Sequence, residues 1–130
     1  MTSTPAKSYM EIALAEARAA AARGEVPIGA VIVATDGRVL AQAGNRTREY
    51  SDPTAHAEVL AIRAACAAAG SERLTGADLY VTLEPCAMCA GAIVLARIRR
   101  LVFGATDPKA GYCGSLGDLV RSIRPEKRIT

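Results

Sequence analysis

The first part of the chain has an alanine-rich segment with charges interspersed, followed by a nearly all-apolar segment. The segment 8–22 is rich in alanine, with Ile12 and Leu14 placed among charged residues, and alanine has the highest intrinsic helix propensity. This pattern predicts a helix that Gly24 can end, because glycine adopts the left-handed conformation at low cost. The next segment, 27–34 (PIGAVIVA), is β-branched and almost entirely apolar, which predicts a buried strand.

A turn, a second strand and a second helix are expected next. The Asp-Gly pair at 36–37 is typical of a tight turn, and 38–44 (RVLAQAG) predicts the returning antiparallel strand. The polar run 45–53 predicts a loop. The alanine-rich segment 54–69 has apolar residues at helical spacing, which predicts a second helix with Thr54 as its cap.

Strands and helices alternate in the rest of the chain. Segments 77–83 and 100–105 predict strands, and 85–96 predicts a helix that begins at a proline, where the missing N–H does no harm. We expect a short helix within 116–123 and the start of a fifth strand within 123–130. This order predicts an α/β fold of three layers, α/β/α, with a mixed sheet of four to five strands.

Length and composition favour a single domain that spans 1–130. A chain of 130 residues buries enough surface for a core without disulfides, and 51% hydrophobic with only 4% aromatic residues predicts an aliphatic core. We find no run of 18 apolar residues and no basic start followed by an apolar stretch. We therefore expect no membrane association and a cytoplasmic location.

Charge alone does not identify the partner. A formal net charge of +3 neither demands nor excludes nucleic acid. Basic residues form two clusters, Arg97, Arg99 and Arg100, and Arg121, Arg124, Lys127 and Arg128. Each cluster by itself is typical of a solvated surface, whereas two clusters beside a catalytic site would favour a substrate that carries phosphate.

Two of the four cysteines have the spacing of metal ligands. Cys86 and Cys89 lie three residues apart at a predicted helix start, so they project from one face. The positive potential of a helix start favours their thiolates, which makes the pair half of a zinc site. A redox Cys-x-x-Cys motif and two inert buried cysteines are alternatives at this point. Disulfides are disfavoured because no secretory signal supports them.

The chain has one histidine, and it completes the candidate site. His56 stands at the start of the second predicted helix as Cys86 stands at the start of the third, and sites in wound sheets gather at such ends. Histidine with two cysteines leaves a fourth zinc position for water, as in catalytic sites, although Cys113 could close a structural site. Glu58 does not share the helix face of His56, so it is the candidate to move a proton from that water to a leaving group.

The order His-x-Glu followed by Pro-Cys-x-x-Cys is the signature of zinc-dependent nucleobase deaminases. Several longer words surround it: GEVPIGAVIV (24–33), GNR (44–46), DPTAHAEVLAIR (52–63), LYVTLEPCAMCAGAI (79–93) and ARIRRLVFGA (96–105). With these words, over about 9–119, the chain resembles the bacterial tRNA adenosine deaminase family of the cytidine/deoxycytidylate deaminase superfamily.

That resemblance implies a cytidine-deaminase-like fold, a Zn²⁺ cofactor held by His56, Cys86 and Cys89, and Glu58 as the catalytic proton carrier. It implies hydrolytic deamination of adenosine to inosine at the wobble position of an arginine tRNA anticodon. It also implies a homodimer that binds the tRNA anticodon loop.

The resemblance also assigns the pocket that would receive the base. Asn45 would hydrogen-bond the flipped base, although an asparagine after a strand is equally typical of a turn. The backbone N–H of Ala55 would line the pocket. Its apolar walls would be Pro27, Ile28 and Leu83.

The sequence departs from the family pattern in two places. Family members continue past a fifth strand into a C-terminal helix, whereas this sequence stops at Thr130. Tyr112 and Cys113 stand where small residues are expected, and Tyr112 would either stack on a base or fill space.

Two other functions compete with tRNA deamination. The first is a deaminase of a free base or nucleoside, such as cytosine or guanine, with the same chemistry. The second is a non-catalytic zinc-stabilised module that binds RNA or a protein partner. Glu58 argues against the second, since a structural zinc site needs no general base.

Overall fold

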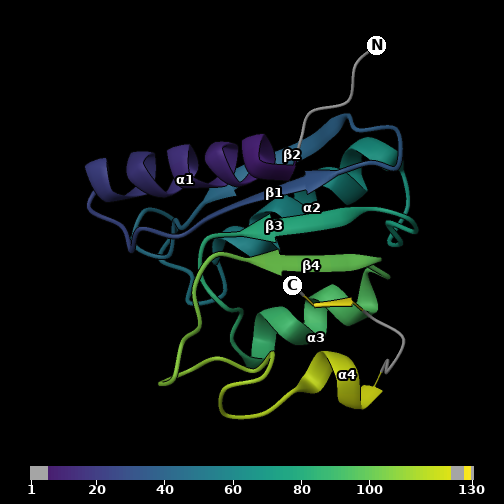
Figure 1. The fold of residues 1–130 in the computed structure, drawn as a ribbon. Coiled ribbons are helices and arrows are strands. Elements are labelled where there is room, and N and C mark those ends of the chain that lie inside the picture. The colour runs from purple at the N-terminus through teal and green to yellow at the C-terminus, as the bar shows by residue number, and fades with distance from the viewer. Residues whose placement is uncertain (1–5, 124–127, 130) are drawn as a thin grey trace.

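A mixed sheet of five strands, in the order β2-β1-β3-β4-β5, runs through the middle of the molecule (Figure 1). The computed structural model describes residues 6–123 and 128–129. Its elements are α1 Ala6–Ala22, β1 Gly29–Val33, β2 Val39–Gly44, α2 Ala57–Ala69, β3 Asp78–Val81, α3 Ala87–Leu95, β4 Arg100–Phe103, α4 Leu119–Ile123 and β5 Arg128–Ile129. The predicted α/β fold with four to five strands is confirmed.

The pairing of the strands decides which ends come together. β1 pairs antiparallel with both β2 and β3, whereas β3, β4 and β5 are mutually parallel neighbours. The start of β1 therefore lies beside the end of β2 and the end of β3. We call this edge of the sheet the metal-site end, because both cysteines of the candidate site follow β3.

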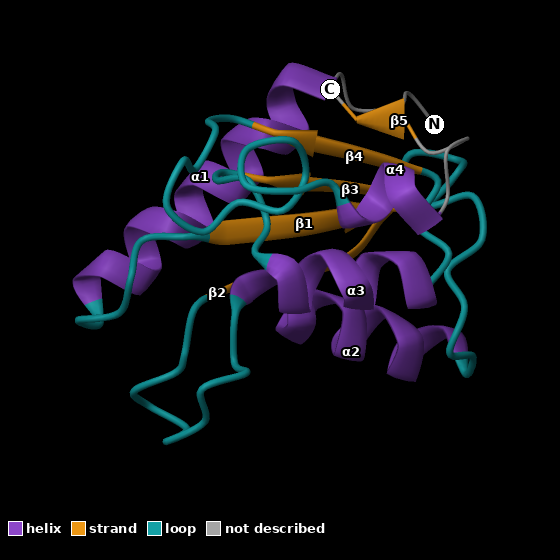
Figure 2. Cartoon of the chain, turned by 90° about the horizontal axis from the view of Figure 1, so that it is seen from below, coloured by secondary structure: helices purple, strands orange, loops and turns teal. Residues whose placement is uncertain are grey.

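Helices cover both faces of the sheet, which makes three layers. Figure 2 shows α2 and α3 side by side across one face, with α1 across the other. Alternating residues of β3 serve the two faces: Tyr80 packs with the α1 cluster, and Leu79 with the larger cluster beneath α2 and α3. At the start of β1 a Cβ on Gly29 would stand 1.9 Å from the carbonyl oxygen of Ala13, so only glycine allows α1 to pack this closely.

The second helix begins later than the sequence predicts. α2 starts at Ala57, and Thr54 does not cap it; the Thr54 N–H and hydroxyl instead donate to the Asp52 carboxylate at 2.8 and 2.7 Å. The helix is capped from outside its own segment, because Asn45 Oδ1 accepts the Ala57 N–H at 2.8 Å. The loop before α2 is therefore tied to the end of β2.

None of the helices in the described ranges is long and apolar enough to cross a bilayer. The expected turn at Gly37 is present, with φ +91°. The fifth strand expected near the end of the chain is present as two residues that pair with β4. The side chains of the second basic cluster beyond Arg121 lie outside the residues whose side chains the structure describes.

Candidate metal centre and active site

Three segments far apart in the sequence converge at the metal-site end. Asn45, just past β2, donates its N–H to the carbonyl of Ile28 at 3.2 Å, which joins the end of β2 to the start of β1. His56 directly precedes α2, and Cys86 directly precedes α3. Because β3 leads directly into Cys86, the fold brings the histidine and the cysteines to one place.

The three candidate ligands lie at distances that suit one metal ion. The Nδ1 atom of His56 is 3.4 Å from Sγ of Cys89 and 3.7 Å from Sγ of Cys86. A tetrahedral zinc ion, with bonds of about 2.3 Å to sulfur and about 2.0–2.1 Å to nitrogen, separates its ligand atoms by about 3.6 Å. Donor set and spacing both fit zinc. Among the described residues no fourth histidine, cysteine or carboxylate joins the group, so Cys113 is not part of it.

The two thiols are electrostatically coupled. A hydrogen bond from the Cys89 thiol lowers the pKa of Cys86 to about 5, against the opposing effect of burial. The same hydrogen bond, together with burial, raises the pKa of Cys89. The lowered pKa of Cys86 favours its thiolate, which is the form that binds a metal cation.

Glu58 is a buried carboxylate without its full set of partners. Its side chain is 3% exposed, and within the part of the chain that the structure describes its Oε1 atom has no hydrogen-bond partner. Burial raises the pKa of Glu58 to about 7, although the charge of His56 opposes the shift. A carboxyl group with a pKa near neutrality can both accept and release a proton, which is what a general acid–base needs.

Comparison with known proteins identifies the family of this site. The family model for the cytidine and deoxycytidylate deaminase zinc-binding region matches residues 3–105. The chain belongs to this family. It is accordingly a zinc-dependent hydrolase, and the His56, Cys86 and Cys89 group is positioned for the family's metal.

Similar proteins share most of this deaminase domain. The tRNA-specific adenosine deaminase of Agrobacterium fabrum is 69% identical over 103 residues, which are 79% of this chain and 67% of that protein. A structure solved in work on A-to-I editing by tRNA:A34 deaminases is 57% identical, with a TM-score of 0.86 over 95% of both chains. Guanine deaminase of Bacillus subtilis is 36% identical, with a TM-score of 0.78 over 95% of this chain and 78% of that one.

The residues expected to bind the base differ in burial and in hydrogen bonding. Asn45 is buried and uses Oδ1 to cap α2, while the structure gives its Nδ2 no partner among the described residues. Ala55 is also buried, and its N–H donates to the Asp52 carbonyl at 3.1 Å, so its contact with substrate stays a prediction. Of the expected walls, Ile28 and Leu83 are half-buried and Pro27 is exposed.

Sequence reasoning missed two buried carboxylates that shape the loops around the site. Glu25 accepts the N–H groups of Arg48 and Glu49 at 3.2 and 2.8 Å, within the loop that precedes His56. Glu84 accepts hydrogen bonds from the loop after β4, and these bonds hold its pKa at about 2 although burial opposes them. The one sequence signal of Glu84 was its position as a charged residue directly after the predicted strand 77–83.

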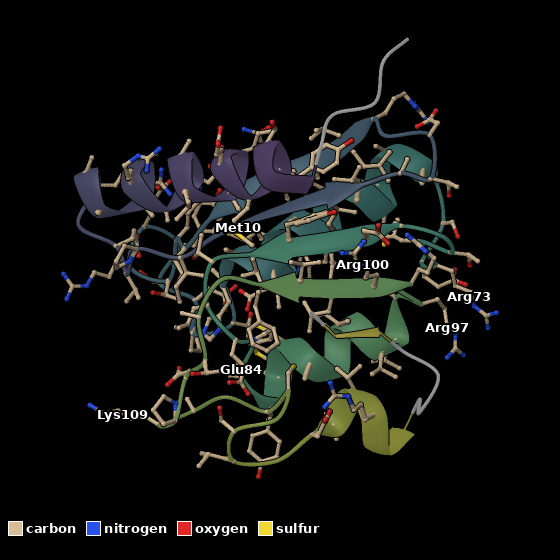
Figure 3. All side chains as sticks on the ribbon, viewed as in Figure 1. Met10, Arg73, Glu84, Arg97, Arg100 and Lys109 are labelled. Carbon is tan, nitrogen blue, oxygen red and sulfur yellow. The ribbon has the colours of Figure 1, made fainter. Side chains whose placement is uncertain are left out.

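The first basic cluster lies away from the metal centre. Arg97 follows the last turn of α3, whereas Cys86 precedes the first, and nine helical residues separate them by about 13 Å. Figure 3 shows Arg73 and Arg97 at one end of the molecule and Glu84 at the other. The guanidinium group of Arg99 donates two hydrogen bonds to the carboxylate of Asp78. This cluster therefore lies at the opposite end of α3 from the candidate metal ligands.

Proposed function

We propose that this deaminase converts adenosine to inosine in tRNA, at the wobble position of an arginine tRNA anticodon, by zinc-dependent hydrolysis in the cytoplasm. The observation that supports a catalytic rather than a structural zinc site is Glu58. Its buried oxygen without a partner lies in a site with three metal ligands and no fourth among the described residues. A closed structural site would have no use for such a carboxylate.

We assign each residue of the site a role in hydrolysis from its chemistry. Zinc held by His56, Cys86 and Cys89 would supply a water whose pKa is lowered toward about 7. Glu58 would take the proton of this water as the water attacks C6 of adenine, and would then deliver the proton to the amino group that leaves as ammonia. The Nδ2 group of Asn45 donates to the base and holds it at the site.

The relatives favour tRNA over a free base. The two tRNA deaminases described above are 69% and 57% identical to this chain, whereas the guanine deaminase is 36% identical. The guanine deaminase nevertheless covers 95% of this chain at a TM-score of 0.78, so deamination of a free purine is the second candidate. The chemistry at Glu58 and the metal would be the same for both substrates.

Ammonia release separates these candidates. Purified protein is offered an arginine-tRNA anticodon stem-loop, cytosine, guanine, adenosine and cytidine in separate reactions. We expect ammonia only from the stem-loop, with inosine in the product. In the same assay Asn45→Asp keeps the acceptor that caps α2 but loses the Nδ2 donor, so we expect a raised KM in a folded protein. Release from guanine alone would refute the tRNA assignment and keep the mechanism.

We also propose that two copies associate through the groove between α2 and α3. This apolar hollow of about 460 Å³ is lined by residues that include Val59, Ile62 and Ala92, with Leu95 at its rim. Leu95 is 75% exposed, and together with the apolar lining of the groove it forms a continuous apolar patch, which is typical of an interaction surface. A two-fold axis would let Leu95 of each copy enter the groove of the other.

Substitution of Leu95 tests this dimer. We expect analytical ultracentrifugation of the wild-type protein to give a mass of twice the 13.5 kDa of one chain. Leu95→Arg should give the mass of a monomer, because a buried unpaired charge opposes association. Leu14→Arg is the matched control, because Leu14 is a 41% exposed leucine on α1, across the sheet from the groove. A dimeric Leu95→Arg protein would move the interface elsewhere.

A further inference from the structure

The carboxylate of Glu84 is enclosed by a single loop. Oε1 accepts the N–H of Asp107 at 3.0 Å and the hydroxyl of Ser115, and Oε2 accepts the N–H groups of Cys113 and Ser115, both at 3.0 Å. The side chain is 3% exposed, and no lysine or arginine among the described residues pairs with it. Hydrogen bonds from neutral donors to a carboxylate are strong, and here they all come from the 107–115 loop.

The loop packs against Glu84 so closely that no side chain fits at Gly111. A Cβ on Gly111 would lie 2.3 Å from Cδ of Glu84 and 2.5 Å from its Oε2 atom. Glycine at this position therefore lets the loop backbone lie directly against the carboxylate. The conformation of the loop depends on two features at once, the four hydrogen bonds of Glu84 and the missing side chain of Gly111.

The same loop is joined to a metal-binding residue. Gly111 forms an isolated antiparallel bridge with Cys86, and the N–H of Tyr112 donates to the carbonyl of Pro85 at 2.9 Å. Figure 3 shows Glu84 beside the start of α3, on the side of the molecule where Lys109 of the loop projects. Glu84 is thus connected to Cys86 in two ways: it lies two residues before Cys86 in the chain, and it holds the loop that pairs with Cys86.

Among the described residues, no hydrogen bond joins this loop to the other two ligands. Cys89 lies inside α3 and is fully buried. His56 precedes α2, whose first N–H is held by Asn45 from the end of β2. Cys86 stands before the first turn of α3, in extended backbone with φ −74° and ψ 176°, and is half-buried. Of the three ligands, it is the one whose backbone is supported by the 107–115 loop.

We propose that Glu84 is a positioning residue for the metal centre, which fixes the backbone of Cys86 through the 107–115 loop and so slows the release of zinc. The inference rests on the zinc site proposed above. Groups that support metal ligands without touching the metal typically change metal affinity by about 10–100-fold when they are removed. We expect an effect of this size, because loss of the carboxylate removes the acceptor of three loop N–H groups, of which that of Cys113 is buried.

The test is the rate at which zinc passes to a coloured chelator. In Glu84→Gln the side-chain amide places N–H groups against N–H groups of the loop, and we expect zinc release about 10–100-fold faster than in wild type. Gly111→Ala reaches the same loop from its other side and keeps the glutamate, so the same acceleration is expected. Val31→Ala is the control: Val31 is fully buried on the α1 face, and its loss lowers thermal stability without touching the loop.

Faster release in Glu84→Gln and Gly111→Ala than in Val31→Ala, at a similar loss of melting temperature, would support the proposal. Release from Glu84→Gln at the rate of Val31→Ala would overturn it. If Glu84→Gln does not fold, Gly111→Ala decides in the same way. Wild-type protein that contains no zinc would instead refute the proposed metal site, which keeps the two failures apart.

Discussion

Replacing Glu58 with glutamine is expected to lower kcat by about 10²–10⁴-fold while the protein keeps its zinc. Glutamine has nearly the same shape but cannot accept the proton of the attacking water. Steady-state ammonia release and the zinc content of the same preparation provide the measurement. Glu11→Gln, at an exposed position on α1, is the matched control and should leave both values unchanged.

The same substitution should not weaken the fold. The Oε1 atom of Glu58 is buried without a partner among the described residues, and burial raises the pKa of this carboxyl group to about 7. Removing a poorly satisfied buried carboxylate removes its desolvation cost, so the melting temperature should stay the same or rise. A Glu58→Gln protein with turnover within tenfold of wild type would assign the proton transfer to another group.

Replacing Cys86 with alanine is expected to reduce zinc from about one ion per chain to a trace. Two ligands remain, and the fourth position is not filled by any other described side chain. The variant should also melt at a lower temperature than wild type, because an ion that binds only the folded state stabilises it. Metal analysis after gel filtration and a melting curve with and without chelator measure both effects.

Cys66→Ala serves as the control for loss of a thiol. Cys66 is half-buried on α2 and does not belong to the metal group, so this variant should keep its zinc. Chelator should lower the melting temperature of wild type and of Cys66→Ala, and leave that of Cys86→Ala unchanged. Full zinc occupancy in Cys86→Ala would exclude Cys86 from the ligand set.

Local sequence signals predicted the elements well because they depend on short-range periodicity. The alanine-rich helix, the apolar strand after it and the Asp-Gly turn all come within a few residues of their predicted limits. The start of α2 is different, since its cap is Asn45, twelve residues upstream, rather than the local Thr54. A cap supplied by the end of another strand leaves no signal in the helix segment itself.

The metal ligands could be predicted from local sequence signals, whereas the buried carboxylates that hold the surrounding loops could not. The metal ligands can be recognised in the sequence by their residue types and by their places at predicted helix starts. They are His56, Cys86 and Cys89. Glu84 and Glu25 cannot be recognised in this way, because a glutamate in sequence is usually exposed and its burial depends on loops that fold over it. The sequence also did not determine whether Arg97 lies near the metal ligands, because spacing along the chain does not say at which end of a helix the site lies.

The way in which Glu84 and Glu25 hold their loops has a consequence for change of substrate. Both carboxylates bind mainly to main-chain N–H groups, which every residue except proline provides. The path of each loop is therefore largely independent of the side chains that it displays. Exposed positions such as Lys109, Ala110 and Arg48 are open to substitution while the loop path is retained. Libraries confined to these positions should diversify recognition while the backbone of both loops stays the same.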